Sequence, residues 1–272
     1  MLDPVNRFTS RVENYVKYRP RYPKQVLEIL RAECGLTPEW RIADIGSGTG
    51  FLTEIFLENG NPTFGVEPNA AMREAAESLL ANYLNFTSLD GTAESTGLDG
   101  SSVEMVTAGQ AFHWFHLAKA KAEFLRILKP GGWVALVWNE RRGGTPFLDA
   151  YEDLLQKFAP EYGQVDHRRI DDHVLADFFS PAGFGRRSCD NVQAFDLDGI
   201  TGRLMSSSYA PEPETPGHQE MIDELGRIFE KHQTNGRVLF EYDTNVYFGR
   251  LAVWAPPSVE SGESFQSVVQ GR

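Results

Sequence analysis

The sequence predicts an α/β protein with a doubly wound sheet whose strands are mostly parallel. Short apolar stretches alternate with amphipathic stretches of helical period between residues 24 and 139, which is the pattern of strand–helix–strand units. Three alternate glycines directly follow the first apolar stretch. Polar side chains stand at or just past the ends of four predicted strands, at Asp44, Glu67, Asp90 and Gln110. Ligands bind at the carboxyl ends of parallel strands, so we expect these side chains at one shared site.

The composition is typical of a reduced, soluble protein. With 272 residues, 41% of them hydrophobic, the chain can form one large domain or two modest ones. Its 38 acidic residues outnumber the 26 basic ones, which argues against a nucleic-acid partner because phosphate binding needs a basic surface. Cys34 and Cys189 form no metal-spaced pair, and no stretch resembles a signal core or a membrane span. We therefore expect a cytoplasmic protein with no metal site, no disulfide framework and no membrane partner.

The first 23 residues are expected to form a separate N-terminal segment. Residues 8–23 are rich in aromatic and basic groups, and Pro20 and Pro23 stop any helix near residue 18. Such an arm either packs its aromatic rings on the domain or acts as a lid that places Tyr15 and Arg19 over a bound anion. An amphipathic helix is predicted next, from residue 24 to residue 34.

Residues 40–139 carry the first five predicted strands, at 41–45, 63–67, 85–89, 103–108 and 133–138. The fourth of them is almost entirely apolar, as expected of a strand that is buried on both faces. Helices are predicted at 51–59, 70–80 and 117–128. Asn69 is a favourable N-cap for the second helix, and Pro130-Gly131-Gly132 is expected to end the third.

The pattern changes beyond residue 139. Helices are predicted at 147–158, 174–179, 198–207 and 219–232, with a strand at 186–195 and a strand or hairpin at 238–254. The helical stretch 197–235 lies between the last two predicted strands, so we expect it to form a cap inserted over the ligand site. The main domain would then span residues 24–254. The tail, residues 255–272, is rich in Pro, Ser, Gly and charge and is expected to be disordered.

The spacing of the glycines distinguishes between two kinds of ligand. Residues 44–50 read Asp-Ile-Gly-Ser-Gly-Thr-Gly, an acidic-x-G-x-G-x-G pattern between a strand and a helix N-terminus. A dinucleotide fingerprint, G-x-G-x-x-G, would need a glycine at position 51, and that residue is Phe51. The spacing therefore argues against a nicotinamide-dependent oxidoreductase.

This pattern resembles motif I of the class I S-adenosylmethionine-dependent methyltransferases. The resemblance extends over residues 40–139 through Glu67-Pro68-Asn69, Gly91-Thr92-Ala93-Glu94, Gln110 to Phe115 and Leu128 to Gly132. Together with Tyr15 to Pro23 and Tyr242 to Arg250, these stretches are similar to the "type 11" subgroup, which includes trans-aconitate methyltransferase-like enzymes. The resemblance implies a Rossmann-like sheet of seven strands and the cofactor S-adenosyl-L-methionine.

The resemblance also implies which residues hold the cofactor. The glycines approach its methionine part, and Glu67 accepts both ribose hydroxyls as a strand-end acid does in nucleotide sites. Thr92 stands where many relatives carry an acid, so Asp90 or Glu94 would have to replace the contact to the adenine amino group. The implied cofactor residues are Tyr15, Arg19, Asp44, Gly46, Ser47, Gly48, Gly50, Glu67, Pro68, Met72, Thr92, Ala93, Glu94, Gln110 and Ala111.

The candidate catalytic residue is His113, the histidine placed beside the expected methyl donor. It would serve as a general base or, equally, shape the pocket, because a carboxylate acceptor is already ionised and needs no base. Trp114 and Trp138 are expected to wall an apolar pocket around the sulfonium, or else belong to the core. Arg141 and Arg142 follow the fifth strand and suit the recognition of a carboxylate, unless they are exposed charges on a loop.

The sequence as a whole predicts a methyltransferase that acts on a small molecule, through transfer to an oxygen, with a carboxylate as the favoured acceptor. Two other functions stay open at this point. One is a regulatory protein that binds the cofactor without turnover, and the other is an oxidoreductase on the same fold. The identity of the acceptor and the oligomeric state are not predicted.

Overall fold

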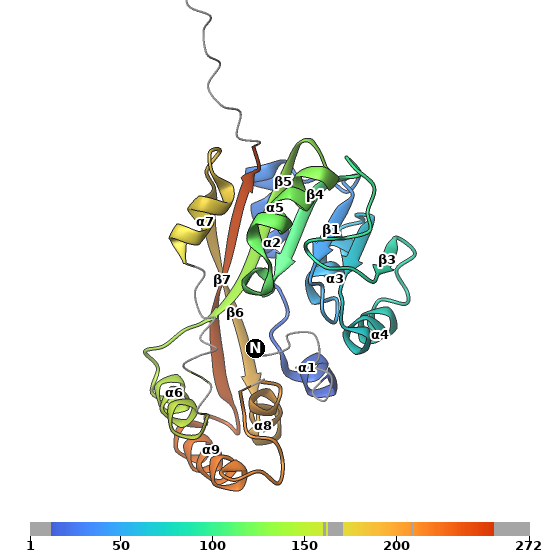
Figure 1. Cartoon of the computed structure of the whole chain (residues 1–272). Coiled ribbons are helices and arrows are strands. Elements are labelled where there is room, and N and C mark those ends of the chain that lie inside the picture. The colour runs from blue at the N-terminus through green and yellow to red at the C-terminus, as the bar shows by residue number, and fades with distance from the viewer. Residues whose placement is uncertain (1–11, 160–161, 163–170, 208, 253–272) are drawn as a thin grey trace, which may run out of the picture.

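A computed structural model describes residues 12–159, 162, 171–207 and 209–252 of the chain. At its centre is a seven-stranded sheet with the order β3-β2-β1-β4-β5-β7-β6 (Figure 1). β1 to β5 are parallel, and β7 runs antiparallel to both of its neighbours. The prediction of a mostly parallel, doubly wound sheet of seven strands is confirmed. The strands are β1 (Ile42–Ile45), β2 (Thr63–Val66), β3 (Phe86–Leu89), β4 (Val103–Gly109), β5 (Leu128–Arg141), β6 (Gly185–Phe195) and β7 (Val238–Arg250).

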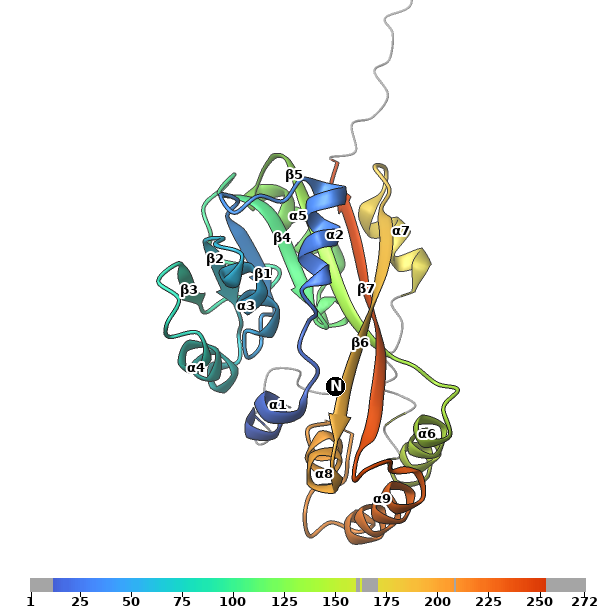
Figure 2. The same cartoon turned by 180° about the vertical axis from the view of Figure 1, so that it is seen from behind.

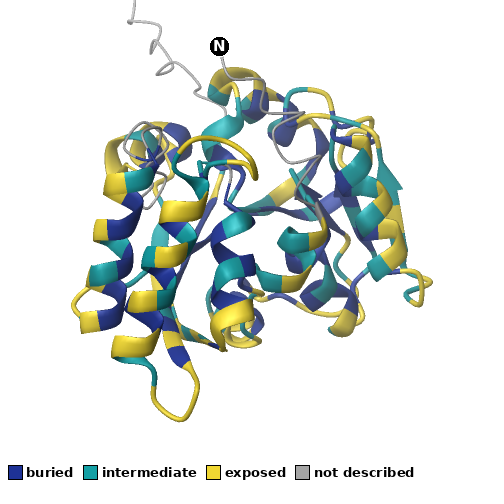
Figure 3. Ribbon diagram, turned by 90° about the horizontal axis from the view of Figure 1, so that it is seen from below, coloured by how far each residue is buried: buried dark blue, intermediate teal, exposed yellow. Residues whose placement is uncertain are grey.

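Most of the helices are amphipathic, with buried residues along one side and exposed residues along the other (Figure 3). Local signals set several of their ends. Asn69 Oδ1 accepts a hydrogen bond from Met72 N at 3.0 Å as the N-cap of α4, and the left-handed Gly35 ends α2. The helices are α1 (Val12–Tyr18), α2 (Gln25–Cys34), α3 (Phe51–Glu58), α4 (Ala70–Leu79), α5 (Leu117–Ile127), α6 (Pro146–Phe158), α7 (Asp172–Phe179), α8 (Leu197–Met205) and α9 (His218–His232).

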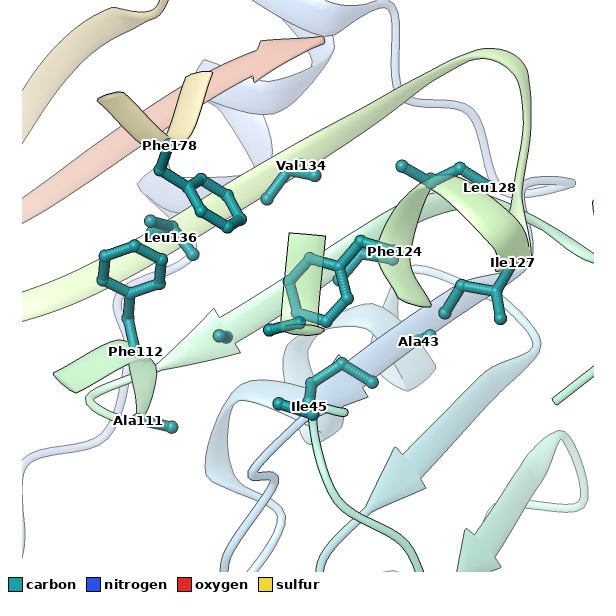
Figure 4. Packing of buried hydrophobic residues seen from close by; sticks show 14 of the residues in the cluster. Ala43, Ile45, Ala111, Phe112, Phe124, Ile127, Leu128, Val134, Leu136 and Phe178 are labelled. Atoms are coloured by element: carbon teal, nitrogen blue, oxygen red, sulfur yellow. The ribbon is translucent and has the colours of Figure 1, made fainter. Parts of the chain in front are cut away.

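Both faces of the parallel sheet are covered, because successive side chains of a strand point to opposite faces. On one face, Val134 and Leu136 of β5 pack with residues of α5 and α7, such as Phe124 and Phe178 (Figure 4). On the other face, the alternate residues of the same strands pack with α2 and α3. This double burial explains why the central strands read as apolar runs rather than as alternating patterns.

A third cluster of buried residues lies apart from these two, at the far ends of β6 and β7. There α6, α8 and α9 pack on Phe240 and Tyr242 of β7 and form a helical layer (Figures 1 and 2). α8 and α9 come from the chain between β6 and β7, which is the segment expected to act as a cap. The N-terminal helix α1 lies between this layer and the parallel strands.

One expected boundary was wrong, and one alternative was decided in favour of a strand. Gly131 and Gly132 lie inside β5, which begins at Leu128, and do not precede the strand. A Cβ atom on Gly132 would lie 2.9 Å from the carbonyl oxygen of Glu104, so this glycine permits the close approach of β4 and β5. The alternating stretch from residue 238 is one strand, β7, and not a hairpin, because it pairs with β5 on one side and with β6 on the other.

Part of the chain lies outside the described residues. This applies to residues 1–11 of the predicted N-terminal segment and to the tail from residue 253. In the described part, no helix is long and apolar enough to cross a membrane.

Candidate active site

The glycine-rich turn between β1 and α3 needs its glycines for different reasons. All three have a positive φ: +65° at Gly46, +55° at Gly48 and +87° at Gly50. A Cβ atom on Gly46 would lie 2.6 Å from Cβ of Ala111, and one on Gly50 would lie 2.7 Å from Cδ1 of Leu80. At Gly48, no atom lies within 4 Å of the added Cβ position. Gly48 is therefore the glycine whose bare backbone faces open space, where a ligand can approach it.

Asp44 is fully buried at the end of β1. Thr53 Oγ1 donates a hydrogen bond to its Oδ2 at 2.7 Å, and Thr107 Oγ1 donates to its Oδ1 at 3.1 Å. Burial raises the pKa of Asp44 to about 7, although both hydrogen bonds oppose this shift. The carboxyl group thus titrates near neutral pH, and a cationic ligand beside it would favour its ionised form.

Glu67, directly after β2, is bonded back to the glycine turn. Its Oε2 accepts from Gly48 N and its Oε1 accepts from Asn69 N, both at 2.9 Å. Burial raises the pKa of Glu67, and these two backbone hydrogen bonds and the charge of Arg73 oppose the shift. Each carboxylate oxygen can accept a second hydrogen bond, so Glu67 can still bind a pair of hydroxyls.

The residues predicted to contact the adenine lie on the β2 and β3 side of the glycine turn. Met72 is buried in the first turn of α4, and Ala93 is buried against the core. Glu94 Oε1 accepts a hydrogen bond from His116 N at 2.7 Å. Their contacts with the adenine stay predictions, for Pro68, Met72, Thr92, Ala93 and Glu94 alike.

A cavity of about 180 Å³ lies beside the glycine turn. Its walls are formed by the N-terminal segment, the glycine turn with α3, the ends of β4 and β5, and the helical layer. Of the predicted site residues, Gly50, Ala111, Glu67, Arg142 and the adenine set do not line it. Those that it brings together are Tyr15, Arg19, Asp44, Gly46, Ser47, Gly48, Gln110, His113, Trp114, Trp138 and Arg141.

The N-terminal segment forms one wall of this cavity and is held from two sides. The ring of Tyr15 stacks on Phe51 of α3, with 6.1 Å between the ring centroids. On the opposite side, Arg19 Nη2 donates to the carbonyl oxygen of Ser206 at 2.9 Å, and Gln193 Nε2 donates to the carbonyl oxygen of Arg19 at 3.4 Å. The segment therefore bridges the parallel sheet and the helical layer.

Aromatic rings form a second wall. His113 lies in the short 3-10 turn η2 (Phe112–Trp114) that follows β4. Its ring centroid is 4.5 Å from that of Trp114 and 5.1 Å from that of Trp138, which is buried near the end of β5. The imidazole therefore packs against both indoles and lines the same cavity as the glycine turn.

Several buried polar atoms on the cavity wall form no hydrogen bond with the described part of the chain. In Gln110, Nε2 donates to the carbonyl oxygen of Asn139 at 3.1 Å, whereas Oε1 has no such partner. An unsatisfied buried polar atom is costly, and its presence at a cavity is consistent with a polar ligand. The atoms are Arg19 Nε, Thr49 Oγ1, Gln110 Oε1 and Asn139 Nδ2.

The two arginines predicted for substrate binding are separated by the sheet. They are neighbours on β5, and neighbouring side chains of a strand point to opposite faces. Arg141 lines the cavity, where it forms an ion pair with Glu152 and donates to Tyr162 Oη at 2.9 Å. Arg142 lies outside the cavity and donates from Nε to Asp243 Oδ1 at 2.9 Å.

One cation on the cavity wall was not predicted from the sequence. Arg203 lies on α8 and is 7% exposed. A signal for it existed, because Arg203 occupies the apolar stripe of its helix, three residues after the buried Ile200 and next to the buried Leu204. The other lining residues that were not predicted as site residues are Pro20, Tyr22, Thr49, Phe51, Leu52, Gly109, Asn139, Tyr162, Tyr209 and Tyr242.

This fold and this site define a class of protein, the S-adenosylmethionine-dependent methyltransferases of class I. The residues fit the cofactor on three observations: the open backbone at Gly48, the available lone pairs of Glu67 on the neighbouring strand, and the unsatisfied polar atoms beside the turn.

Comparisons with known proteins agree with this class. Residues 43–136 match the family model of the methyltransferase domain. An uncharacterized methyltransferase of Schizosaccharomyces pombe is 32% identical over 247 residues, which are 88% of this chain and 95% of the relative. An uncharacterized methyltransferase of Mycobacterium tuberculosis is 37% identical over 134 residues, 49% of this chain and 52% of the relative. The chain therefore belongs to the methyltransferase family, and it is an S-adenosylmethionine-dependent enzyme.

The fold is shared with solved structures. The structure of a candidate type II methyltransferase from Anaeromyxobacter dehalogenans is similar with a TM-score of 0.63 and 23% identity, and the match covers 86% of this chain and 98% of that chain. Of the functions left open by the sequence, the family supports the methyltransferase over the oxidoreductase and over a protein without turnover.

Proposed function

We propose that the enzyme transfers a methyl group to an oxygen atom of a small molecule, and that a carboxylate is the favoured acceptor group. One observation carries this proposal: a cavity of about 180 Å³, lined by arginines and aromatic rings, lies beside the glycine turn. Such a space suits a small molecule better than a macromolecule. The likeness of residues 15–23, 110–115 and 242–250 to the type 11 subgroup with trans-aconitate methyltransferase-like enzymes supports the same choice.

The proposed placement of the cofactor follows from the residues around the turn. The backbone at Gly48 adjoins the methionine part, Asp44 stabilises its ammonium group, and Arg19 with Tyr15 holds its carboxylate. Glu67 accepts the ribose hydroxyls in addition to its two backbone hydrogen bonds. S-adenosylmethionine, when bound, supplies an electrophilic methyl group on a sulfonium.

The chain then mainly has to align the acceptor with this methyl group and exclude water. An acceptor oxygen forms a bond to the methyl carbon, and the carbon–sulfur bond breaks with its electron pair left on sulfur. A hydroxyl acceptor must also lose its proton, for which His113 on the cavity wall is the candidate base. A carboxylate acceptor has no proton to lose, so His113 would then only shape the pocket.

The cations on the wall favour the carboxylate. Arg141 lines the cavity, and Arg19, which is assigned to the carboxylate of the cofactor, adds positive charge on the same cavity wall. Planar guanidinium groups suit carboxylates because they present parallel N–H donors. Arg142, which pairs with Asp243 outside the cavity, is expected to contribute less.

Release of S-adenosylhomocysteine tests the proposal, measured with the purified enzyme, S-adenosylmethionine, and a panel of small carboxylic acids, phenols and amines. With an acceptor identified, His113→Gln, Arg19→Ala and Arg141→Ala are compared with Arg227→Ala, an exposed arginine of α9. For a carboxylate, Arg141→Ala raises the KM of the acceptor, Arg19→Ala raises the KM of the cofactor, and His113→Gln has a small effect. For a hydroxyl, His113→Gln lowers kcat by about 10²–10⁴-fold. Loss of activity in His113→Gln with an unchanged acceptor KM in Arg141→Ala would rule out the carboxylate.

The N-terminal segment is proposed to act as a lid over the bound cofactor. Residues 12–22 close one wall of the cavity through contacts to both the sheet and the helical layer. Release of these contacts would open a path to the glycine turn, which is how lids exclude water from a reaction.

A further inference from the structure

Arg203 is a buried cation whose hydrogen-bond partners in the described part of the chain are all neutral. Its Nε donates to Tyr242 Oη at 3.2 Å, and its Nη1 donates to Ser207 Oγ at 3.2 Å. The guanidinium carbon lies 5.3 Å from the ring centroid of Phe240. No described carboxylate pairs with Arg203, and its Nη2 has no hydrogen-bond partner among the described residues. The charge therefore lacks a counterion on the cavity wall.

Such an arrangement is unusual because buried charges are normally paired. The same cavity provides the contrast, since Arg141 has the carboxylate of Glu152 as its partner. A second cation stands near Arg203: burial and then the charge of Arg203 lower the pKa of Arg19. Arg19 and Arg203 thus line one cavity, and neither forms an ion pair with an acid in the described part of the chain, so an anion in the cavity would neutralise their charge.

Arg19 and Arg203 contact different residues. Arg19 lies over the ring of Tyr15, which stacks on Phe51 at the start of the glycine-turn helix. Arg203 is held by Tyr242 and Phe240 in the helical layer. Arg203 therefore belongs to the helical layer, whereas Arg19 bridges the two sides of the cavity, because its Nη2 also donates to the carbonyl oxygen of Ser206 at 2.9 Å.

We propose that Arg203 anchors a carboxylate group of the acceptor, distinct from the oxygen that receives the methyl group. This rests on the proposed function in so far as the acceptor is a small molecule in the cavity. A planar guanidinium matches a carboxylate, and the hydroxyl of Tyr209 on the same wall adds a donor. Arg203 lies in the helical layer and the methyl donor is proposed to lie beside the glycine turn, so the oxygen that attacks the methyl group is a different one. The acceptor then carries an anionic end toward α8 and a reactive oxygen toward the glycine turn.

The first test measures binding and needs no turnover. The melting temperature of the enzyme, loaded with S-adenosylhomocysteine, is measured with acetate, benzoate and succinate and with their neutral amides, at equal ionic strength. We expect at least one acid to stabilise the wild type more than its amide does. Arg203→Met, which keeps the apolar volume, abolishes this difference, and Arg227→Met on the exposed side of α9 retains it. The anchor is refuted if no acid exceeds its amide or if Arg203→Met responds like the wild type.

Two further readouts separate an anchor from a structural arginine. Arg203→Met should leave the Kd for S-adenosylhomocysteine within about twofold, and the ligand-free variant should be at least as stable as the wild type because an unpaired buried charge is gone. Once an acceptor is known, Arg203→Met should raise its KM by about 10–100-fold with little change in kcat, and Arg203→Lys should restore part of the loss. A variant that is strongly destabilised, with an unchanged KM, would show that Arg203 is structural.

These results are independent of the proposed reaction. Carboxylate binding that requires Arg203, without any methyl transfer to oxygen, would overturn the reaction and leave the anchor standing. Methyl transfer to an oxygen of a neutral acceptor, at a rate that Arg203→Met does not change, would overturn the anchor and leave the reaction standing.

Discussion

Tyr18 of α1 packs so closely on Gly202 of α8 that a Cβ atom at position 202 would lie 2.0 Å from Cε2 of the tyrosine ring. This contact joins the N-terminal wall of the cavity to the helical layer. Because α8 also carries Arg203, the position of the wall and that of the anion anchor depend on the same pair of helices.

Gly202→Ala should therefore displace Tyr18 and loosen the N-terminal wall. Overpacking of this kind typically costs about 1–3 kcal/mol. Hydrogen exchange of residues 12–22 should be slowed by S-adenosylhomocysteine in the wild type and remain fast in the variant. Gly226→Ala is the matched control on α9: it has no atom within 4 Å of its Cβ position and should stabilise the protein slightly. If S-adenosylhomocysteine does not change the hydrogen exchange of residues 12–22 in the wild type, the segment does not act as a lid.

Gly48→Val should abolish cofactor binding, because its side chain would fill the open space beside the turn. The positive φ adds a strain of about 1–2 kcal/mol, which has to be separated from the effect on binding. Gly236→Val provides that control, since Gly236 also has a positive φ of +73° and no atom within 4 Å of its Cβ position. Calorimetric titration with S-adenosylhomocysteine should show binding in Gly236→Val only, and binding in both variants would contradict the role of Gly48.

Glu67→Ala should weaken the binding of S-adenosylhomocysteine by about 1–3 kcal/mol, the scale of hydrogen bonds to a charged group. The fold should remain, because the carboxylate bonds only to backbone N–H groups at the strand end. Circular dichroism checks the fold, and titration calorimetry measures the affinity. Unchanged affinity would mean that Glu67 only supports the turn.

The raised pKa of Asp44 predicts that the free energy of unfolding depends on pH. Its pKa of about 7 in the folded protein exceeds the ordinary value of 3.8, so the folded state retains a proton between these two values. Stability from this group is therefore full below about pH 4 and falls as pH rises toward 7, by about 4 kcal/mol in total. Urea unfolding of the wild type and Asp44→Asn measures it. Their difference in unfolding free energy should shift by that amount between pH 4 and 7, and a constant difference would contradict the assignment.

Much of the fold could be predicted from the sequence because the central parallel strands are buried on both faces. Ile42 to Ile45 and Val103 to Ala108 are recognisable as runs with no exposed side. The course of β5 through Gly131 and Gly132 could not be predicted, since a glycine pair after a helix reads as a terminator. Only the neighbouring β4 backbone shows that Gly132 permits close approach.

The site could be predicted where it follows strand ends, as at Asp44 and Gln110. It could not be predicted where distant segments meet. Arg141 and Arg142 look equivalent in sequence, and only the sheet directs Arg141 into the cavity and Arg142 away from it. Arg203 stands on an apolar helix face, but its lack of a described acidic partner depends on the packing of α8 against β7.

The most direct measurement of the central claim uses S-adenosylmethionine labelled with carbon-13 in its methyl group. The enzyme is incubated with this cofactor and each acid that stabilises it, and the product is observed by NMR. If the methyl group is transferred to oxygen, we expect a labelled methyl carbon at the chemical shift of a carbon bonded to oxygen, with S-adenosylhomocysteine formed in equal amount. A label found on nitrogen, carbon or sulfur, or labelled cofactor that remains intact with every acid that binds, would contradict it.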